Sequence, residues 1–364
     1  MRRVKLIVNL KLQPTPEQAK ALRRTLELAN QACNAISQQA WETKTFKQYN
    51  LHKLVYHTIR DTFGLSAQVV VRLIAKVADA YKLDTKAKRV FRKHGSIAYD
   101  DRILSFKREE RVSIWTVEGR QTIPFVCGDY QRKLLPFRKG ETDLIYRKGN
   151  FYLNAVCDVD EPLLDGAQDV LGVDFGIVNL ATDSDGCVFT GAKVDQTRRR
   201  YAHRRRNLQR KQTRSARRKL KQLSGRQARF QRDANHVISK RLVLKAKDTM
   251  RALAIEDVKG IRERVTVRRS QRARHSNWAF AQLRSFLEYK SKLYGVALCA
   301  VDPRNSSREC SRCGYTDKAN RPSQDKFLCQ SCGYSANADL NAALNLRARG
   351  VSITQTSTPV DKAA

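Results

Sequence analysis

Acidic residues are scarce in this sequence, and their scarcity sets the class of partner that we expect. Asp and Glu total 35 against 71 Lys and Arg, so the 364 residues carry a formal net charge of +36. Such a chain would repel itself unless a polyanion neutralised it, and phosphate backbones are the usual counter-charge. A surface that only aids solubility normally mixes both signs. The composition therefore predicts a nucleic-acid-binding protein.

Other features are missing altogether. No run approaches the roughly 18 apolar residues that a membrane span needs, and MRRVKLIVNLKLQPT lacks the apolar core of a signal peptide. The six histidines form no HExxH-type metal motif, and no Walker loop indicates an NTPase. Nine cysteines, an odd number, argue against a disulfide framework. We expect a cytoplasmic, nucleoid-associated protein without a membrane partner.

The first half of the chain predicts a β module with inserted helices. Apolar residues alternate from Val4 to Leu12, which indicates a strand, and a capping box at Thr15 begins a helical unit. Further helices are expected near 50–62 and from Ser66. After Gly95 come short β-rich runs, with turn signals at Gly119, Gly140 and 148–150; the runs are 103–106, 112–116, 121–125 and 151–159. Pairing them with the first strand would give a small barrel or sandwich.

The pattern changes to α/β from Asp169. It predicts strands at 170–174, 180–183 and 187–189, a long basic helical stretch, a strand at 251–256, a helix near 277–294 and a strand at 297–301. Three antiparallel strands followed by alternating helices and strands is the order of an RNase H-like domain. The Ser/Thr-rich tail from Val351 is predicted to be disordered.

Four cysteines have the spacing of a metal site. Cys310-Ser311-Arg312-Cys313-Gly314 and Cys329-Gln330-Ser331-Cys332-Gly333 are two CxxC-Gly knuckles, in which glycine permits the tight turns. Four thiolates close a tetrahedral Zn²⁺ site and leave no position for a substrate water, which makes the role structural. A redox CxxC, or cysteines without metal, is the alternative.

Two acids stand in apolar strands, where a carboxylate is costly unless a cation compensates it. A third begins a helix, and a lone acid of this kind is more often an N-cap or a surface charge; three in a consistent order favour a shared site. Asp174 lies in the apolar run LGVDFG, Glu256 ends LAIE, and Asp339 begins the helical run DLNAALNL. Oxygen ligands of this kind select Mg²⁺ or Mn²⁺, and two such ions can hydrolyse a phosphodiester. Adjacent strand residues face opposite ways, so only one of Glu256 and Asp257 can point at the metals.

Basic residues are concentrated between Lys193 and Lys247, where 21 Lys or Arg stand against two acids. A solvated basic face is one interpretation; phosphate contact is favoured, because binding displaces counterions from a nucleic acid. A second basic stretch covers 262–275, and it suggests a lid over the acids. The residues predicted to contact nucleic acid are Arg198, Arg199, Arg200, Arg204, Arg205, Arg206, Arg268, Arg269 and Arg304.

The order of these motifs resembles a known family. LGVDFGIVNLAT, LAIEDVKGI, SSRECSRCG and CQSCGYSANADLNAALNL are similar to the TnpB family of transposon-encoded RNA-guided nucleases, which is related to type V CRISPR effectors. The resemblance is most specific over 169–349. It implies that Asp174, Glu256 and Asp339 are the catalytic acids, and it selects Glu256 over Asp257. A guide RNA and double-stranded target DNA beside a short flanking motif are the implied partners.

The same resemblance implies a modular fold class. A RuvC-like nuclease domain, RNase H-like in fold, would comprise 169–303 and 334–350, with a zinc ribbon inserted at 304–333. A wedge-like β-barrel domain would comprise 1–14 and 96–168, with a helical recognition insertion at 15–95 and a disordered tail at 351–364. A compact type V CRISPR effector, a transposase, and a catalytically silent RNA-guided regulator are alternatives; a regulator would be expected to lack one of the acids, and all three are present.

Overall fold

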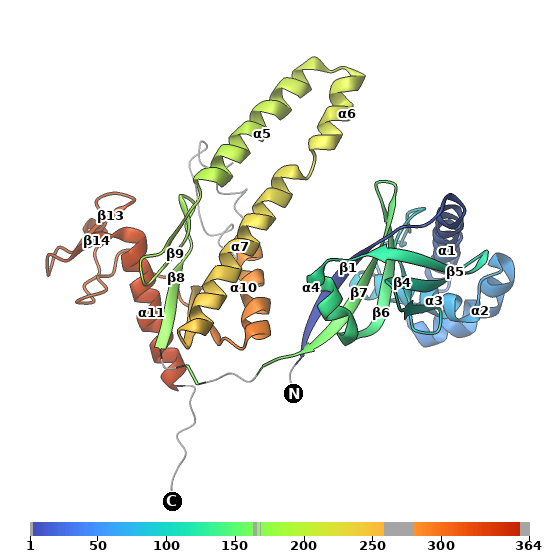
Figure 1. Ribbon diagram of the computed structural model, residues 1–364, viewed down its shortest axis with the longest axis horizontal. Helices are drawn as coiled ribbons and strands as arrows, with labels where there is room; N and C mark the ends of the chain where they lie inside the picture. Colours follow the sequence, from blue (N-terminus) through green and yellow to red (C-terminus); the bar gives the residue numbers. More distant parts are fainter. Residues whose placement is uncertain (1–2, 163–165, 168, 258–279, 357–364) are drawn as a thin grey trace, which may run out of the picture. The chain divides into compact units, whose positions relative to one another are not determined.

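The chain folds as two compact units, residues 3–159 and residues 160–364. The computed structural model describes residues 3–162, 166–167, 169–257 and 280–356. Among these, no helix combines the length and apolar character that crossing a membrane requires. Each unit has its own sheet and its own helices (Figure 1).

A seven-stranded sheet forms the first unit, with antiparallel pairing within β2-β6-β7 and within β1-β5-β4-β3. Strand β1 (Arg3–Leu12) alternates exposed and buried residues along its whole length, as predicted. The order is β2-β6-β7-β1-β5-β4-β3. The edge strands β2 and β3 are consecutive in the chain, and the sheet curls into a nearly closed barrel. Tyr99 Oη of β2 donates to the carbonyl of Trp115, in β4, at 3.2 Å. The remaining strands are β2 (Ile97–Tyr99), β3 (Leu104–Lys107), β4 (Arg111–Thr116), β5 (Gly119–Val126), β6 (Arg138–Arg147) and β7 (Asn150–Asp160).

The prediction of a turn at Gly140 was wrong. Gly140 lies inside strand β6 with a φ of 83°, and the register between β6 and β7 shifts between Arg138 and Thr142. Glycine there permits a bulge, in which one strand carries extra residues without ending. Because a turn was expected at Gly140, strand β6 was not predicted.

Three helices are inserted between β1 and β2. They are α1 (Pro16–Glu42), α2 (Gln48–Phe63) and α3 (Ala67–Leu83). The predicted capping box begins α1: the Gln18 N–H donates to Thr15 Oγ1 at 3.3 Å, and the Thr15 N–H donates to Gln18 Oε1 at 3.1 Å. A second, short helix pair follows β5, α4 (Asp129–Leu134) and the 3-10 helix η1 (Leu135–Phe137).

The second unit has a five-stranded sheet of order β10-β9-β8-β11-β12. The first three strands along the chain are antiparallel neighbours, whereas β11 runs parallel to both β8 and β12. This confirms the predicted sequence of strands within one or two residues at their ends. The strands are β8 (Asp169–Asp174), β9 (Asn179–Asp183), β10 (Val188–Thr190), β11 (Arg251–Glu256) and β12 (Leu298–Val301).

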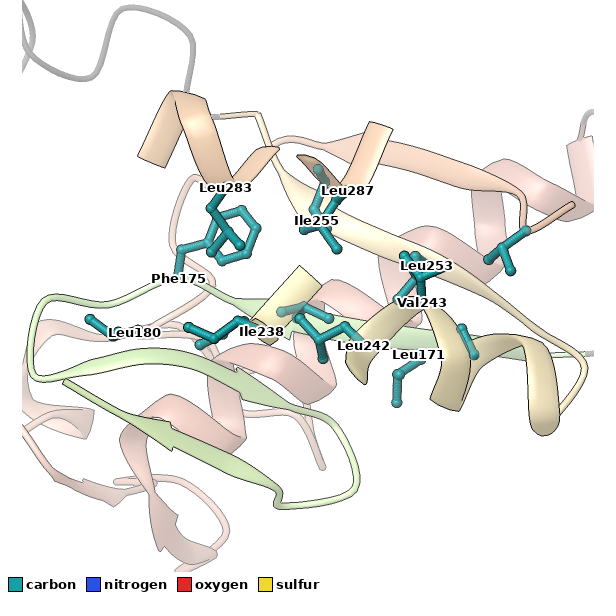
Figure 2. Packing of buried hydrophobic residues seen from close by; sticks show 14 of the residues in the cluster. Leu171, Phe175, Leu180, Ile238, Leu242, Val243, Leu253, Ile255, Leu283 and Leu287 are labelled. Carbon is teal, nitrogen blue, oxygen red and sulfur yellow. The ribbon is translucent and has the colours of Figure 1, made fainter. Parts of the chain in front are cut away.

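Helices cover both faces of this sheet because alternate strand residues point to opposite sides. Leu171 and Leu253 pack against α7 (Arg226–Asp248) and α10 (Phe280–Tyr294) in the core of Figure 2. Their neighbours Val170 and Ala254 pack on the other face against Leu346 of α11 (Ala338–Thr356). Burying one such leucine contributes about 1.5 to 3 kcal/mol.

Two further predictions are refined by the helices. The long basic stretch forms α5 (Ala192–Lys211), α6 (Arg214–Leu223) and α7 in succession. The predicted tail from Val351 begins too early, since α11 continues to Thr356. Residues 357–364, like the first three residues of the helix expected at 277–294, lie outside the described part of the chain.

Candidate functional site

The parallel pairing of β8 and β11 brings two of the predicted acids together. Ile255 pairs with Val173, so the next residues, Glu256 and Asp174, stand level at the carboxyl ends of the two strands. Their side chains share a hydrogen bond. A single carboxylate at a strand end needs no explanation, but two in contact must hold a proton or a cation between them.

Helix α11 brings the third acid, Asp339, to the same end of the sheet. The helix lies directly on β8, where a Cβ added at Gly172 would come within 2.1 Å of the Ala343 carbonyl oxygen. A Cβ at Gly350 would meet Ala254 Cβ at 2.6 Å. Glycine at both positions therefore allows the close approach that sets the position of Asp339.

Electrostatics at this end of the sheet disfavour ionisation. Burial raises the pKa of Asp174 to about 6; its hydrogen bond with Glu256 acts in the opposite sense, and the charge of Asp339 adds to the increase. Burial, together with the charge and hydrogen bond of Asp174, raises the pKa of Glu256 well above its usual value. Burial and the closeness of the carboxylates therefore disfavour negative charge here, and a bound cation would relieve that cost.

Asp257 faces away from the other acids, as the alternation of strand residues predicts. Its carboxylate forms an ion pair with Arg284 of α10. It therefore belongs to the packing of α10 beside the sheet.

Two residues near the acids were not predicted. Asn179, at the start of β9, donates from Nδ2 to Asp339 Oδ2 at 2.8 Å. The Arg321 guanidinium lies 3.9 Å from the other oxygen of Asp339 and carries charge that acts on Asp174. Asn179 stands in the motif LGVDFGIVNLAT, five residues after Asp174, which is a signal that could have identified it. No pattern marks Arg321, because its position depends on how the cysteine-rich segment folds.

The four predicted zinc ligands lie close together in the structure, near enough to share one metal ion. Their sulfur atoms all lie within 4.8 Å of one another. The glycine after each knuckle has a positive φ, 75° at Gly314 and 71° at Gly333, which is the conformation that the tight turns require. The Cys332 backbone N–H leads the interactions that lower the pKa of Cys329 to about 7. The backbone hydrogen bond from Tyr315 lowers the pKa of Cys313, but hydrogen bonds with the other cysteines outweigh it and raise that pKa to about 12, so the geometry and not the pKa values indicates the metal site.

Hydrogen bonds connect the cysteine-rich segment to the helix that carries Asp339. Asn341 of α11 accepts from the Ser311 N–H at 3.0 Å and donates to the Glu309 carbonyl at 2.8 Å. Asn345, one turn further, donates to the same carbonyl at 2.7 Å. The cysteine-rich segment thus holds the first turns of α11 in place.

The predicted basic contacts differ in how free they are. Arg198 and Arg199 both pair with Asp195, at 2.8 Å each, and Arg198 is largely buried. Arg205 donates to Gln227 of α7 at 3.1 Å. The others described are exposed: Arg204 and Arg206, Arg200 over the Tyr201 ring, and Arg304 beside Asp302. Arg268, Arg269 and the stretch 262–275 lie outside the described residues.

Comparison with known proteins supports the arrangement of the second unit. The family described as "Probable transposase" (OrfB_IS605) matches residues 156–261, and the family described as "Cas12f1-like, TNB domain" matches residues 280–346. The CRISPR-associated endodeoxyribonuclease Cas12f1 of Sulfoacidibacillus thermotolerans is 31% identical over 219 residues, 55% of this chain and 50% of that protein. InsQ of Escherichia coli K12, whose name describes an RNA-guided DNA endonuclease, is 31% identical over 56% of this chain and 54% of that protein.

Two further likenesses extend the comparison. A TnpB-like protein of Methanocaldococcus jannaschii is 28% identical over 62% of this chain and 85% of that protein. The solved structure of a Cas12f1–sgRNA–target DNA complex superposes with a TM-score of 0.61 over 92% of this chain and 83% of that chain, at 16% identity. That similarity concerns the fold. The sequence matches to Cas12f1 and InsQ span about half the length of those relatives.

Proposed function

We propose that this chain is a member of the TnpB family and an RNA-guided DNA endonuclease that cleaves beside a short flanking motif. The observation that carries the proposal is that Asp174 and Glu256 share a hydrogen bond at the ends of two strands, while the charge of Asp339, from a helix, acts on Asp174. The names of its relatives support both the nuclease activity and the guide.

A RuvC-like nuclease domain is the finer fold assignment that we propose for the second unit. Numbered along the chain, its strands have the order 3-2-1-4-5, with the second antiparallel to the first. This is the order expected of an RNase H-like domain. The cysteine-rich segment would then be an insertion just before the final helix of the domain.

The donor set fits divalent metal ions. Three carboxylates offer the oxygen ligands that Mg²⁺ or Mn²⁺ prefers. Burial raises the pKa of Asp174 and Glu256, so a bound cation would favour their ionised forms. When bound, such ions lower the pKa of a water and neutralise charge on a phosphodiester. Asn179 would fix the orientation of Asp339, and Arg321 would face the phosphate charge beside it.

We assign a structural Zn²⁺ to Cys310, Cys313, Cys329 and Cys332. Four thiolates leave no open coordination position, so the ion would fold the ribbon and would not take part in cleavage. Since Asn341 and Asn345 join the ribbon to α11, zinc would also fix the helix that carries Asp339.

Guide RNA and double-stranded DNA are the proposed partners of the whole chain. The exposed cations of α5 and α6 supply phosphate contacts, and the first unit would supply the wedge and recognition modules. Base pairing then gives specificity, while the protein reads duplex shape and the flanking motif.

The test is cleavage by the full-length chain copurified with its RNA. Sequencing that RNA identifies the guide, and replacing its guide segment should redirect cutting to the matching DNA in Mg²⁺. If RNA-free protein cuts its preferred DNA equally well and a new guide moves nothing, the guided function is wrong. Joined DNA ends among the products would indicate a transposase.

A further inference from the structure

Helices α5 and α6 lie side by side and leave an open groove between them. They form the arm that extends from the sheet in Figure 1. The groove has a volume of about 480 Å³ and ends at the first turn of α7. It is distinct from the acidic end of the sheet, and we call it the α5–α6 groove.

Four cations line the α5–α6 groove, and no acid does. Arg204 and Lys211 come from α5, Lys219 from α6, and Arg226 from the start of α7. None of the four has an ion pair or hydrogen bond with another described residue. Like charges facing one another across a groove destabilise the arm, and an anion between them removes that repulsion.

The rest of the lining suits a nucleobase. Leu208 and Leu223 provide apolar surface from opposite helices, and Asn207 and Gln222 provide amide groups. The Asn207 Nδ2 group is in contact with His203 Nε2 at 2.9 Å, which leaves its carbonyl oxygen able to accept from a base edge. Apolar faces with a few polar groups are what small-ligand sites of about 300 to 1,000 Å³ commonly offer.

We propose that the α5–α6 groove holds one unpaired nucleotide of the bound RNA, with its phosphates between the cations and its base between the leucines. This rests on the proposed function, since it requires that the chain carry RNA. Structured RNA presents unstacked bases in loops and bulges, where proteins read them by stacking and by hydrogen bonds to their edges. RNA that stays bound would also remove the repulsion among the facing cations for as long as the complex lasts.

The experiment uses photocrosslinking of the full chain with its copurified RNA. A photoreactive phenylalanine analogue replaces Gln222, which lines the groove, or Gln209, an exposed glutamine of α5 outside it. We expect position 222 to crosslink to one RNA nucleotide, and position 209 to give weak crosslinks spread over several. In parallel, Gln222→Trp should fill the groove and weaken RNA binding by about tenfold, within the range for losing one stacked base.

A charge-matched pair separates the groove from general attraction. Lys219→Ala removes a lining cation, and Arg218→Ala removes an exposed cation next to it on the same helix. Lys219→Ala should weaken RNA binding several-fold more and abolish the single crosslink. Equal losses, a crosslink to DNA or to protein, or no site-specific crosslink in protein that still carries RNA would overturn the groove and leave the proposed function standing. Protein that carries no RNA would overturn both.

Discussion

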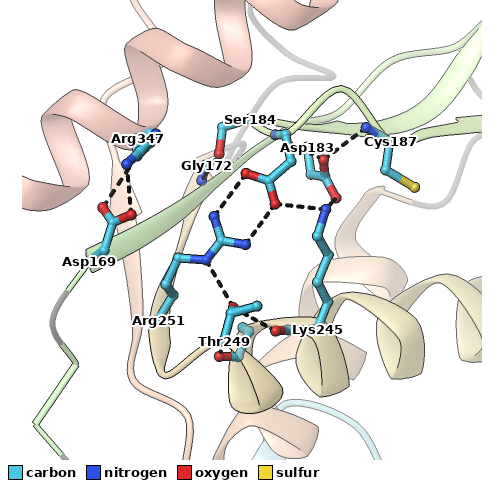
Figure 3. A network of polar contacts seen from close by, with 11 residues as sticks. Asp169, Gly172, Asp183, Ser184, Cys187, Lys245, Thr249, Arg251 and Arg347 are labelled. Carbon is cyan, nitrogen blue, oxygen red and sulfur yellow. Dashed lines mark hydrogen bonds and ion pairs between the residues drawn. The ribbon is translucent and has the colours of Figure 1, made fainter.

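The five-stranded sheet carries two groups of three carboxylates, but cations neutralise only one group. Asp169, where β8 begins beside β11, pairs with Arg347. Asp183, opposite Val173 at the end of β9, and Asp185 in the turn after it are held by Lys245 and Arg251 (Figure 3); the N–O distances are 2.6 to 2.9 Å. Where β8 and β11 end, Asp174 and Glu256 share a hydrogen bond, and the cation nearest to Asp339, Arg321, is 3.9 Å away.

The pKa shifts in the two groups of carboxylates have opposite signs. Hydrogen bonds from Arg251 and Lys245 hold the pKa of Asp185 well below its usual range, although burial opposes them. Burial raises the pKa of both Asp174 and Glu256. The ion-paired group therefore stabilises the fold, and the group of Asp174 and Glu256 costs stability for as long as no cation is bound. Helix α11 contacts both groups, with Asp339 in its first turn and Arg347 near its middle.

Removing zinc should have the largest effect, because it should displace Asp339 while leaving the ion pair of Asp169 with Arg347 in place. Cys329→Ser, or a chelator, should release the ribbon and with it the start of α11, because structural zinc sites contribute on the order of 10 kcal/mol to local folding. We expect one zinc per chain by metal analysis, and loss of cleavage in the variant. The pairing of Asp169 with Arg347 lies near the middle of α11, about two turns beyond Asp339, so hydrogen exchange there should change less than at the start of the helix. Zinc-free protein that still cleaves would exclude this role.

Glu256→Gln should separate activity from stability. Losing a metal ligand should lower the cleavage rate by about 10²- to 10³-fold or more, as for other preorganised charges. Because the raised pKa of Glu256 disfavours the folded state at neutral pH, the metal-free variant should melt at the same or a higher temperature. Asp257→Asn, on the outer side of the same strand end, should retain cleavage. Normal cleavage by Glu256→Gln would refute the assignment.

Asn179→Ala should weaken the acidic end without removing a carboxylate. Hydrogen bonds that orient a metal ligand typically matter by about 10- to 100-fold in metal affinity or activity. We expect the Mg²⁺ concentration for half-maximal cleavage to rise, with much of the rate recovered at high Mg²⁺, and Asn179→Gln to be milder. A fall in rate with unchanged Mg²⁺ dependence would show that Asn179 acts otherwise.

The sequence predicted the site of Asp174, Glu256 and Asp339 better than it predicted the ion-paired carboxylates. Asp174 and Glu256 stand out because each ends an apolar strand, and strand order alone brings them level. Asn179 and Arg321 were missed because their contacts with Asp339 depend on the packing of α11, which Gly172 permits and no periodicity reveals. The pairs of Asp169, Asp183 and Asp185 join residues 62 to 178 positions apart, beyond the range of local patterns. Gly140 misled because a bulge and a turn use the same residue.

Asp183→Asn should break the ion-paired group of carboxylates. Asp183 is almost fully buried, accepts from the Cys187 N–H at 2.9 Å and pairs with Lys245 at 2.7 Å. Losing a charged hydrogen-bond partner costs about 1.5 to 3 kcal/mol. Urea unfolding should show that loss, while cleavage per folded molecule stays normal well below the melting temperature. A variant as stable as the parent would mean that this network does not support the fold.

The smallest effect should be the pH dependence contributed by Asp185. A carboxyl group whose pKa is lower in the folded state adds stability above its unfolded pKa, near 3.9, and loses it as the pH falls towards the folded value. Asp185→Asn should therefore be less stable than the parent at pH 7, by about 1 kcal/mol because the pair is partly exposed. The two proteins should converge as the pH is lowered below about 4. Denaturant titrations at several pH values at constant ionic strength measure this difference. A gap that stayed constant down to pH 2 would show that packing by the side chain, and not its charge, is what the substitution removes.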